Sequence, residues 1–161
     1  MTNDFATADL YDDHAATVQS PQIQWVHVGQ RASFHGPAFT VKVYEDNSLV
    51  REAFGQRGEG RVLVIDGGGS MRRALIGDRL VQLAIDNGWA GALVYGCIRD
   101  RAVIDGMDFG IHCLGTTPCK TQKRGEGQKG IAVEFGGARF EPGHWVYADA
   151  DGVLVAPQVL T

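Results

Sequence analysis

The sequence predicts an α/β protein whose sheet contains at least one pair of parallel strands. Two runs of uninterrupted apolar residues, 62–65 (VLVI) and 92–95 (ALVY), are typical of strands buried on both faces. Between them lies an apolar helical face formed around residues 80–85. Because a crossover that contains a helix joins parallel strands, we expect these two strands to run side by side in the same direction.

Length and charge narrow the possible classes of protein. The chain has 161 residues, which favours a single domain spanning 1–161. Its formal net charge is −4, so no broad positive field is available and direct binding of nucleic acid is not expected. No run approaches the roughly 18 apolar residues that a membrane span requires. We therefore expect a protein without a membrane segment.

Cysteine usage points to a reducing compartment. Cys97, Cys113 and Cys119 are odd in number and sparsely placed, and the first ten residues carry acids where a secretory leader would be basic and then apolar. The sequence therefore predicts a cytoplasmic protein with reduced thiols.

The remaining elements follow from periodicity and from helix-start and turn residues. Thr7 is expected to cap a first helix that Ser20-Pro21 ends, and 38–44 alternates Phe39, Val41 and Val43 inward as a half-buried strand does. Helices are predicted at 7–18, 48–54, 77–88 and 101–107, and strands at 24–28, 38–44, 62–65, 92–95, 109–114, 131–135, 138–140, 145–148 and 153–156.

A triple glycine, Gly67-Gly68-Gly69, ends the first buried strand and invites a nucleotide-binding interpretation. The spacing argues against it. A dinucleotide fingerprint would need a glycine at position 72, where the chain has Arg72, and no Gly-Lys-Ser/Thr ending of a phosphate loop is present. The glycines still permit close approach of a backbone or a ligand, and we expect them to shape a pocket.

The helix that opens at Gly77-Asp78 offers a possible anion site. Asp78 as the N-cap residue is the simplest interpretation. A helix that starts beside a glycine also leaves the N–H groups of Arg79 and Leu80 free to bind an anion such as a carboxylate.

Arg99-Asp100 follows the second buried strand, at the carboxyl end where ligands of parallel sheets bind. A surface ion pair of little energetic value is one interpretation. The other is functional: a lone carboxylate suits a hard divalent cation that keeps most of its waters, and arginine suits a substrate carboxylate or developing oxyanion. In a simple crossover we expect Asp78 at the opposite end of the strands, unless residues 70–76 first return the chain.

Two further polar segments have simple explanations. Asn47 either begins the short helix at 48–54 or reaches a ligand from the end of a strand. Lys120, Lys123 and Arg124 form a basic loop, most simply a solvated one.

Three segments together resemble a known family: 44–50 (YEDNSLV), 61–78 (RVLVIDGGGSMRRALIGD) and 88–100 (GWAGALVYGCIRD). They are similar to the RraA-like family, which includes the regulator of ribonuclease E activity A and class II 4-hydroxy-4-methyl-2-oxoglutarate aldolases. The resemblance extends to residues 152–155. It implies a ββα sandwich of the swivelling-domain type with a central parallel or mixed sheet, and a homotrimer with sites near the subunit interfaces.

The family's aldolases carry an acid, twenty residues, and then Arg-Asp, which here match Asp78 and Arg99-Asp100. The resemblance implies that Asp100 binds Mg²⁺ or Mn²⁺, that Asp78 holds a metal-bound or catalytic water, and that Arg99 contacts the oxo and carboxylate oxygens of the substrate. Gly77, Arg79 and Leu80 would bind the substrate carboxylate, so Asp78 should converge on Asp100. The aldolases also use an acid from a neighbouring subunit, for which we assign no residue.

Two functions remain open. The first is a divalent-metal-dependent lyase that cleaves 4-hydroxy-4-methyl-2-oxoglutarate and similar 2-oxo acids to pyruvate and decarboxylates oxaloacetate. The alternative is a non-enzymatic trimeric regulator that binds and inhibits ribonuclease E or an associated helicase. The acid and Arg-Asp pattern favours the lyase. A methyltransferase, once assigned to proteins of this kind, is disfavoured because no glycine fingerprint for a nucleoside cofactor is present.

Overall fold

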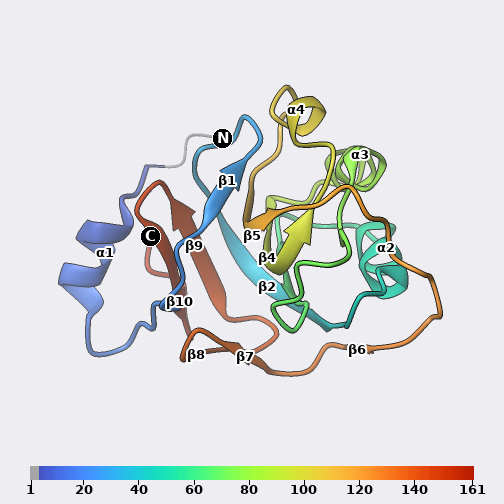
Figure 1. The fold of residues 1–161 in the computed structure, drawn as a ribbon. Helices are drawn as coiled ribbons and strands as arrows, with labels where there is room; N and C mark the ends of the chain where they lie inside the picture. Colours follow the sequence, from blue (N-terminus) through green and yellow to red (C-terminus); the bar gives the residue numbers. More distant parts are fainter. Residues whose placement is uncertain (1–3) are drawn as a thin grey trace.

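A computed structural model describes residues 4–161 and contains a mixed sheet with strand order β1-β5-β4-β3-β2-β9-β10. A short strand, β6, also pairs with β2, and β7 and β8 form a separate two-stranded sheet. In Figure 1, α2 and α3 lie to one side of the central strands, while α1 lies at the far side next to β9 and β10. The expectation of an α/β fold with a parallel and mixed sheet is confirmed.

The helices are α1 (Thr7–His14), α2 (Ser48–Phe54), α3 (Asp78–Asp86) and α4 (Arg101–Ile104). The strands are β1 (Val26–Val28), β2 (Phe34–Lys42), β3 (Val62–Asp66), β4 (Gly91–Ile98), β5 (Ile111–Thr116), β6 (Gln128–Lys129), β7 (Val133–Phe135), β8 (Ala138–Phe140), β9 (Trp145–Asp149) and β10 (Gly152–Ala156). None of the helices described is long and apolar enough to cross a membrane.

Strands β2 to β5 run parallel and form the centre of the sheet. Their register places Lys42 beside Asp66 and Asp66 beside Tyr95, so the carboxyl ends of three strands lie together. Leu63 and Ile65 pack toward α2 and α3, whereas Val62 and Val64 pack toward the β7–β8 and β9–β10 side. Burial on both faces explains why the sequences of these strands are continuous apolar runs.

The first helix and the second strand differ from the prediction. Helix α1 ends at His14, not at residue 18, and its start is capped from a distance: the Asp149 carboxylate accepts hydrogen bonds from the backbone N–H (2.8 Å) and hydroxyl (2.7 Å) of Thr7. In β2, Val41 is buried as expected, but Thr40 is also fully buried and its hydroxyl donates to the carbonyl of Ile131. Contacts with residues distant in the sequence thus replace the predicted local cap of α1 and interrupt the predicted inward–outward alternation of β2.

A buried carboxylate, Asp46, joins the start of α2 to the loop between β5 and β6. It accepts hydrogen bonds from the backbone N–H of Ser48 (2.9 Å) and its hydroxyl (2.7 Å), and from the backbone N–H groups of Arg124 (2.8 Å) and Glu126 (3.2 Å). Burial raises the pKa of Asp46, but these hydrogen bonds outweigh it and lower the pKa from 3.8 to about 2. The ionised form is therefore the one that stabilises the fold.

Asp46→Asn should lower the free energy of unfolding by about 2 kcal/mol at neutral pH, because hydrogen bonds to a charged acceptor are weakened or lost. The lowered pKa means that this contribution is present above pH 3.8 and disappears as the pH falls toward about 2. Urea unfolding at several pH values measures it. The difference between variant and wild type should shrink below pH 3.8. Glu126→Gln is the control, since only the backbone of Glu126 contacts Asp46; an equal loss in both variants would contradict this role.

Candidate active site

Residues 74–76 extend the parallel pairing of β3 with β4 past the end of β3. The N–H of Leu75 donates to the carbonyl of Cys97 (2.9 Å), and the N–H of Arg99 donates to the carbonyl of Ile76 (2.9 Å). Helix α3 therefore starts beside the carboxyl end of β4. Asp78 thus lies next to Asp100, as the family resemblance implied. The premise that a simple crossover would put Asp78 at the opposite end of the strands was wrong, because a crossover helix runs back antiparallel to its strands and its first turn follows the carboxyl end of the strand without any returning element.

Asp100 faces the first turn of α3. Its Oδ2 accepts a hydrogen bond from the backbone N–H of Asp78 at 3.1 Å. The backbone of Asp100 is left-handed (φ 60°, ψ 34°), a conformation that asparagine and aspartate tolerate better than most residues. The N-cap position belongs to Gly77, not Asp78 as predicted, and a Cβ on Gly77 would lie 2.8 Å from Asp100 Oδ2. The absence of a side chain on Gly77 thus permits this close approach of the Asp100 carboxylate.

The next two N–H groups of α3, those of Arg79 and Leu80, have no acceptor within residues 4–161. They lie at the positive end of the helix dipole. This agrees with the prediction that they are free to bind an anion.

Arg99 and Asp100 do not form a salt bridge with each other, which excludes the simple surface ion pair. Arg99 is half-buried and Asp100 is exposed. The atom Oδ1 of Asp100 has no hydrogen-bond partner in the described chain. Both residues therefore have polar atoms available to a ligand.

These residues line one pocket of about 580 Å³. All of the predicted site residues (Gly77, Asp78, Arg79, Leu80, Arg99 and Asp100) belong to its wall, and the rest of the lining consists of Asn47, Arg51, Ala74, Lys120, Thr121 and Lys123. The sequence prediction therefore located one side of the pocket and missed the other, which comes from α2 and the β5–β6 loop.

The residues that were missed are mainly basic. Arg51 on α2 and Lys123 in the loop had no motif to mark them, and the loop was interpreted as a solvated one. The only available signal was the cluster of Lys120, Lys123 and Arg124. Asn47 also lines the pocket, but its side chain is occupied: it donates to the carbonyl of Leu75 (3.2 Å) and accepts from the hydroxyl of Thr121 (2.8 Å). Asn47 therefore holds three segments of the wall together.

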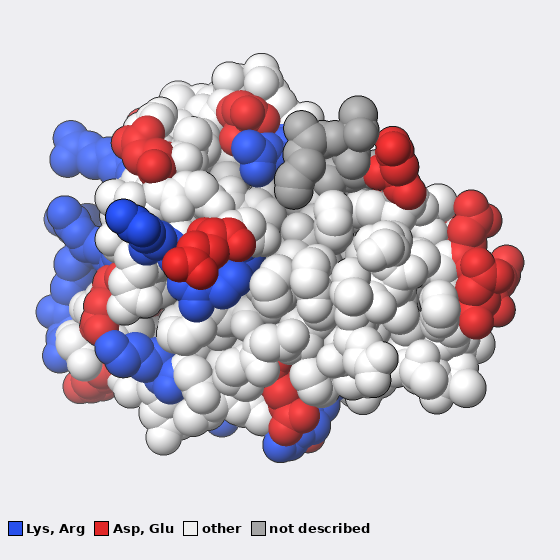
Figure 2. All heavy atoms as spheres, turned by 180° about the vertical axis from the view of Figure 1, so that it is seen from behind, with Lys and Arg blue, Asp and Glu red and all other residues white. Residues whose placement is uncertain are grey.

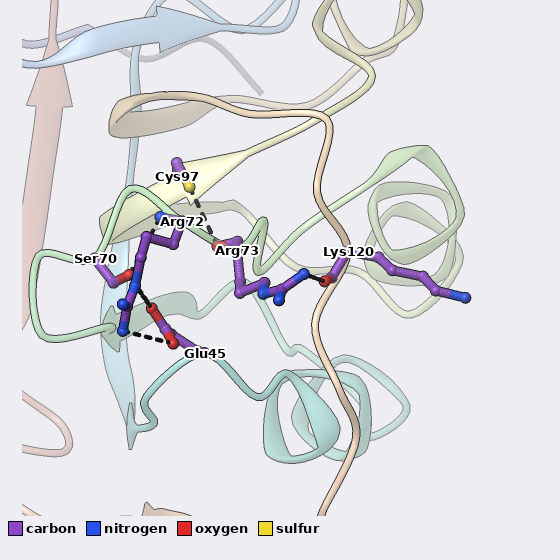
Figure 3. Close-up of polar contacts among 6 residues, drawn as sticks. All are labelled: Glu45, Ser70, Arg72, Arg73, Cys97 and Lys120. Atoms are coloured by element: carbon purple, nitrogen blue, oxygen red, sulfur yellow. Dashed lines mark hydrogen bonds and ion pairs between the residues drawn. The ribbon is translucent and has the colours of Figure 1, made fainter.

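A polar clamp fixes the segment that leads into the pocket (Figure 3). Glu45 accepts hydrogen bonds from the hydroxyl of Ser70 (2.6 Å) and from Nε of Arg72 (2.7 Å), and Arg73 donates to the backbone carbonyl of Lys120 (3.3 Å). The hydrogen bonds to Arg72 and Ser70 hold the pKa of the Glu45 carboxyl below its usual range. The clamp places residues 70–73 between the loop after β2 and the β5–β6 loop.

The triple glycine does not shape this pocket, contrary to the prediction. Gly68 lines a different cavity, of about 590 Å³, beside Tyr44 and Tyr95. A Cβ on Gly67 would lie 2.8 Å from the carbonyl oxygen of Tyr95, so this glycine permits close approach of two backbones. The glycines thus serve the turn after β3.

Two carboxylates, Asp78 and Asp100, are the acids of the pocket. Residues 4–161 hold no cluster of three or more His, Cys, Asp or Glu side chains that could bind a metal. Hard oxygen donors, few in number and with space around them, suit a cation such as Mg²⁺ that retains several waters, and do not suit a structural zinc.

Comparison with known proteins gives consistent matches over nearly the whole chain. The model of the RraA-like family, described as Aldolase/RraA, matches residues 7–155. A protein of Dechloromonas aromatica (strain RCB), provisionally named 4-hydroxy-4-methyl-2-oxoglutarate aldolase, is 53% identical to this chain. The alignment covers 98% of this chain and 99% of that protein. A protein of Pseudomonas aeruginosa (strain PAO1) with the same provisional name is 50% identical, covering 97% of this chain and 96% of its own.

Two solved structures share the fold closely. One, titled as an S-adenosylmethionine:2-dimethylmenaquinone methyltransferase from Geobacillus kaustophilus, has a TM-score of 0.95 and 49% identity, with 97% of each chain covered. The other, the RNA-processing inhibitor RraA from Thermus thermophilis, has a TM-score of 0.94 and 36% identity, covering 98% of this chain and 96% of that one. These two proteins share one fold but carry different functional names. The function of this chain must therefore be inferred from the chemistry of its site.

Gly77→Ala should push the Asp100 carboxylate away from α3, because the new methyl group would lie 2.8 Å from Oδ2. Loss of the hydrogen bond to Asp78 is expected to lower the free energy of unfolding by about 1 kcal/mol. Thermal unfolding and a crystal structure of the variant check this. Gly106→Ala is the matched control, since its added Cβ would meet its nearest neighbour, the carbonyl oxygen of Val103, only at 3.4 Å. An unmoved Asp100 in the Gly77 variant would contradict the proposed contact.

Proposed function

The chain belongs to the RraA-like family, and from that premise we propose that it is a divalent-metal-dependent lyase that forms pyruvate from 2-oxo acids. The substrates would be 4-hydroxy-4-methyl-2-oxoglutarate and similar acids, with oxaloacetate decarboxylation as a second reaction. The observation that carries the proposal is the convergence of Asp78, Arg99 and Asp100 on one pocket at the start of α3. The provisional names of relatives about half identical to this chain support it.

The substrate would bind at the start of α3. Its C1 carboxylate fits the free N–H groups of Arg79 and Leu80 and the dipole of the helix. Gly77 leaves room for this group to approach the backbone. The Arg99 guanidinium, which has no carboxylate partner in the described chain, can donate to both the carboxylate and the C2 oxo oxygen.

Asp100 would hold the cation, Mg²⁺ or Mn²⁺, through its unpartnered Oδ1, with Asp78 reaching it through water. When bound, the cation would polarise the C2 oxo group as a Lewis acid. The hydrogen bond from Asp78 N–H to Oδ2 fixes the orientation of the Asp100 carboxylate. This donor set fits a hard cation.

Cleavage moves one proton and one electron pair. The C4 hydroxyl passes its proton through a water to the Asp78 carboxylate, the C3–C4 bond breaks as C4 becomes a carbonyl, and the electron pair is delocalised onto the C2 oxygen as a pyruvate enolate. Arg99 stabilises the developing negative charge on that oxygen. Asp78, through a water that it holds, returns a proton to C3 and completes pyruvate. Loss of CO₂ from oxaloacetate leaves the same enolate, so one site serves both reactions.

The regulator of ribonuclease E remains the second interpretation, because the RNA-processing inhibitor of Thermus has this fold. A regulator that acts through its surface needs no pocket with two acids beside an arginine, and the pocket therefore favours the lyase. We also propose a homotrimer in the cytoplasm, as the family resemblance implies. Sedimentation velocity would measure the assembly, and a pull-down with ribonuclease E would test the regulatory role.

Asp100→Asn should reduce pyruvate release from both 4-hydroxy-4-methyl-2-oxoglutarate and oxaloacetate by about a hundredfold or more, because the charged cation ligand is lost. Asparagine tolerates the left-handed backbone and its amide oxygen can still accept from Asp78, so the fold should survive. Coupled pyruvate detection with and without EDTA measures the effect. EDTA should abolish the wild-type activity, and Mg²⁺ or Mn²⁺ should restore it.

Asp105→Asn serves as the control, because Asp105 is exposed, lies on the following turn and is absent from the pocket wall. Its activity should equal that of the wild type. Wild-type rates in Asp100→Asn, or activity that survives EDTA, would rule out the proposed metal-dependent lyase.

A further inference from the structure

Two histidines lie opposite each other at an edge of the sheet, outside the pocket at the start of α3. In the antiparallel pairing of β1 with β5, His27 is the direct partner of His112, and their Nδ1 atoms are 3.4 Å apart. His112 is buried and His27 is half-buried. Neither residue belongs to the wall of the candidate active site, so the proposed lyase reaction leaves this pair without a role.

The other nitrogen of each ring is already bound to a backbone carbonyl. Nε2 of His27 lies 3.0 Å from the carbonyl oxygen of Gly29, and Nε2 of His112 lies 2.8 Å from the carbonyl oxygen of Asp149. A carbonyl oxygen only accepts hydrogen bonds, so both Nε2 atoms must carry a proton. If both rings were neutral, each Nδ1 would then be an acceptor, and two lone pairs would face each other in a largely buried place with neither of them satisfied.

The two carbonyl groups are held in place from elsewhere. The peptide that carries the Gly29 carbonyl is fixed on its other side, since the N–H of Gln30 donates to the carbonyl of Met107 (3.0 Å). The carboxylate of Asp149 accepts from the N–H and hydroxyl of Thr7 at the start of α1. If either ring moved its proton from Nε2 to Nδ1, a lone pair would face one of these fixed carbonyl oxygens. One additional proton on the pair removes the conflict without moving any of these groups.

The charged groups around the pair favour a positive charge on it. Asp149 and Asp151, from the β9–β10 turn, line a cavity of about 80 Å³ beside the two rings, and the described lining of this cavity contains no Lys or Arg. Asp105, which follows α4, approaches at Gly29, where its carboxylate accepts from the backbone N–H (3.0 Å). Carboxylates without a neighbouring cation stabilise the protonated form of a histidine.

The distribution of charge over the surface agrees with this. Figure 2 shows acidic side chains at the edge of the molecule where α1 lies, with Lys and Arg gathered along the opposite edge, which carries α2 and α3. The β9–β10 turn belongs to the acidic side, because Asp149 contacts the start of α1.

The pair can hold one such charge but not two. Uncharged side chains pack on His112 from the remaining elements. The rings of Phe34 in β2 and Trp25 before β1 have their centroids 5.4 and 6.2 Å from it, and Leu93 of β4 is its neighbour in the sheet. This burial lowers the pKa of His112. A second proton would also place two positive charges on rings whose nitrogens are 3.4 Å apart. The less buried ring, His27, is therefore the one suited to carry the proton.

We propose that His27 and His112 bind one shared proton, and that this proton joins the loop after β1 to the β9–β10 turn. Doubly protonated His27 donates from Nε2 to the carbonyl of Gly29 and from Nδ1 to His112. His112 stays neutral and donates from Nε2 to the carbonyl of Asp149, so every ring nitrogen has a partner. Loss of the proton breaks this chain of hydrogen bonds, and the fold thus contains a pH-sensitive contact between an edge strand and the turn that caps α1.

Replacing His27 by phenylalanine tests the direction of the pH dependence. The hydrogen bond from His27 to His112 exists only in the protonated form, so the stability that it contributes is present at low pH and is lost as the pH rises. In urea unfolding, the unfolding equilibrium constant of His27→Phe should be at least about tenfold above that of wild type at roughly pH 5.5, and within about threefold of it at roughly pH 9. The lowered pKa of His112 acts the other way, costing stability below its ordinary value of 6.5, but this cost is common to both proteins and cancels in their ratio.

His14→Phe is the matched control, because His14 ends α1 and has no part in the contact between the two rings. The ratio of its unfolding constant to that of wild type should change by less than about threefold over the same pH range. A ratio for His27→Phe that stays constant, or that grows as the pH rises, overturns the shared proton. An equal pH dependence in His14→Phe overturns it as well.

Nitrogen NMR of the wild-type protein, labelled with ¹⁵N-histidine and treated with EDTA, tests the same point without a variant and decides alone if His27→Phe does not fold. At roughly pH 6, His27 should carry protons on both nitrogens and His112 only on Nε2, with a scalar coupling between the two Nδ1 atoms across the hydrogen bond. Two unprotonated Nδ1 atoms, or no coupling between them, would overturn the inference. Neither experiment uses a substrate, so both outcomes are independent of whether the chain is a lyase.

Discussion

The backbone pairing of residues 74–76 with the end of β4 is the constraint on which the site depends. Two hydrogen bonds, Leu75 to Cys97 and Arg99 to Ile76, hold the segment before α3 in line with the strand that follows the helix. They bring together two acids that are separated by 22 positions in the sequence, Asp78 and Asp100. Without this pairing α3 could still pack on the sheet, but its first turn would have no fixed position relative to Asp100.

The other wall depends on a different kind of interaction, the buried polar groups of residues 46–48. Asp46 satisfies backbone N–H groups of the β5–β6 loop, and Asn47 bridges Leu75 and Thr121. A loop of exposed, polar residues has too little apolar surface to order itself by burial. Here hydrogen bonds to one carboxylate and one amide order it instead. The two walls are thus built by different means but meet at Asn47.

Much of the fold could be predicted from the sequence, because apolar runs indicate buried strands and glycines indicate turns. The parallel strands β3 and β4, the helix α2 and the closing of α3 before Gly88 followed from pattern alone. The capping of the start of α1 and the burial of Thr40 did not, because they depend on partners far along the chain, Asp149 and Ile131. The two-residue strand β6 was also missed, since it is too short and too exposed to show a period.

The residues of the candidate site also fall into two groups, those that local sequence patterns identify and those that only the three-dimensional structure identifies. Asp78, Arg99 and Asp100 were identified because they adjoin elements with a strong pattern, and a family resemblance linked them. Arg51 and Lys123 could not be found in this way, since a lysine or arginine in a polar segment looks the same whether it faces solvent or a pocket. What distinguishes them is that neither has a carboxylate partner among residues 4–161, and pairing depends on which side chains lie close together in three dimensions.

The helix start explains how Arg99 and Asp100 can be neighbours without neutralising each other. Asp100 turns, through its left-handed backbone, toward the N–H of Asp78 at the positive end of α3. That conformation is costly, by about 1 kcal/mol for a residue with a side chain. The hydrogen bond and the helix dipole offset this cost, and the carboxylate needs no arginine to compensate its charge. Arg99 is then left free for the substrate, so the strained residue and the unpaired cation are two consequences of the same contact.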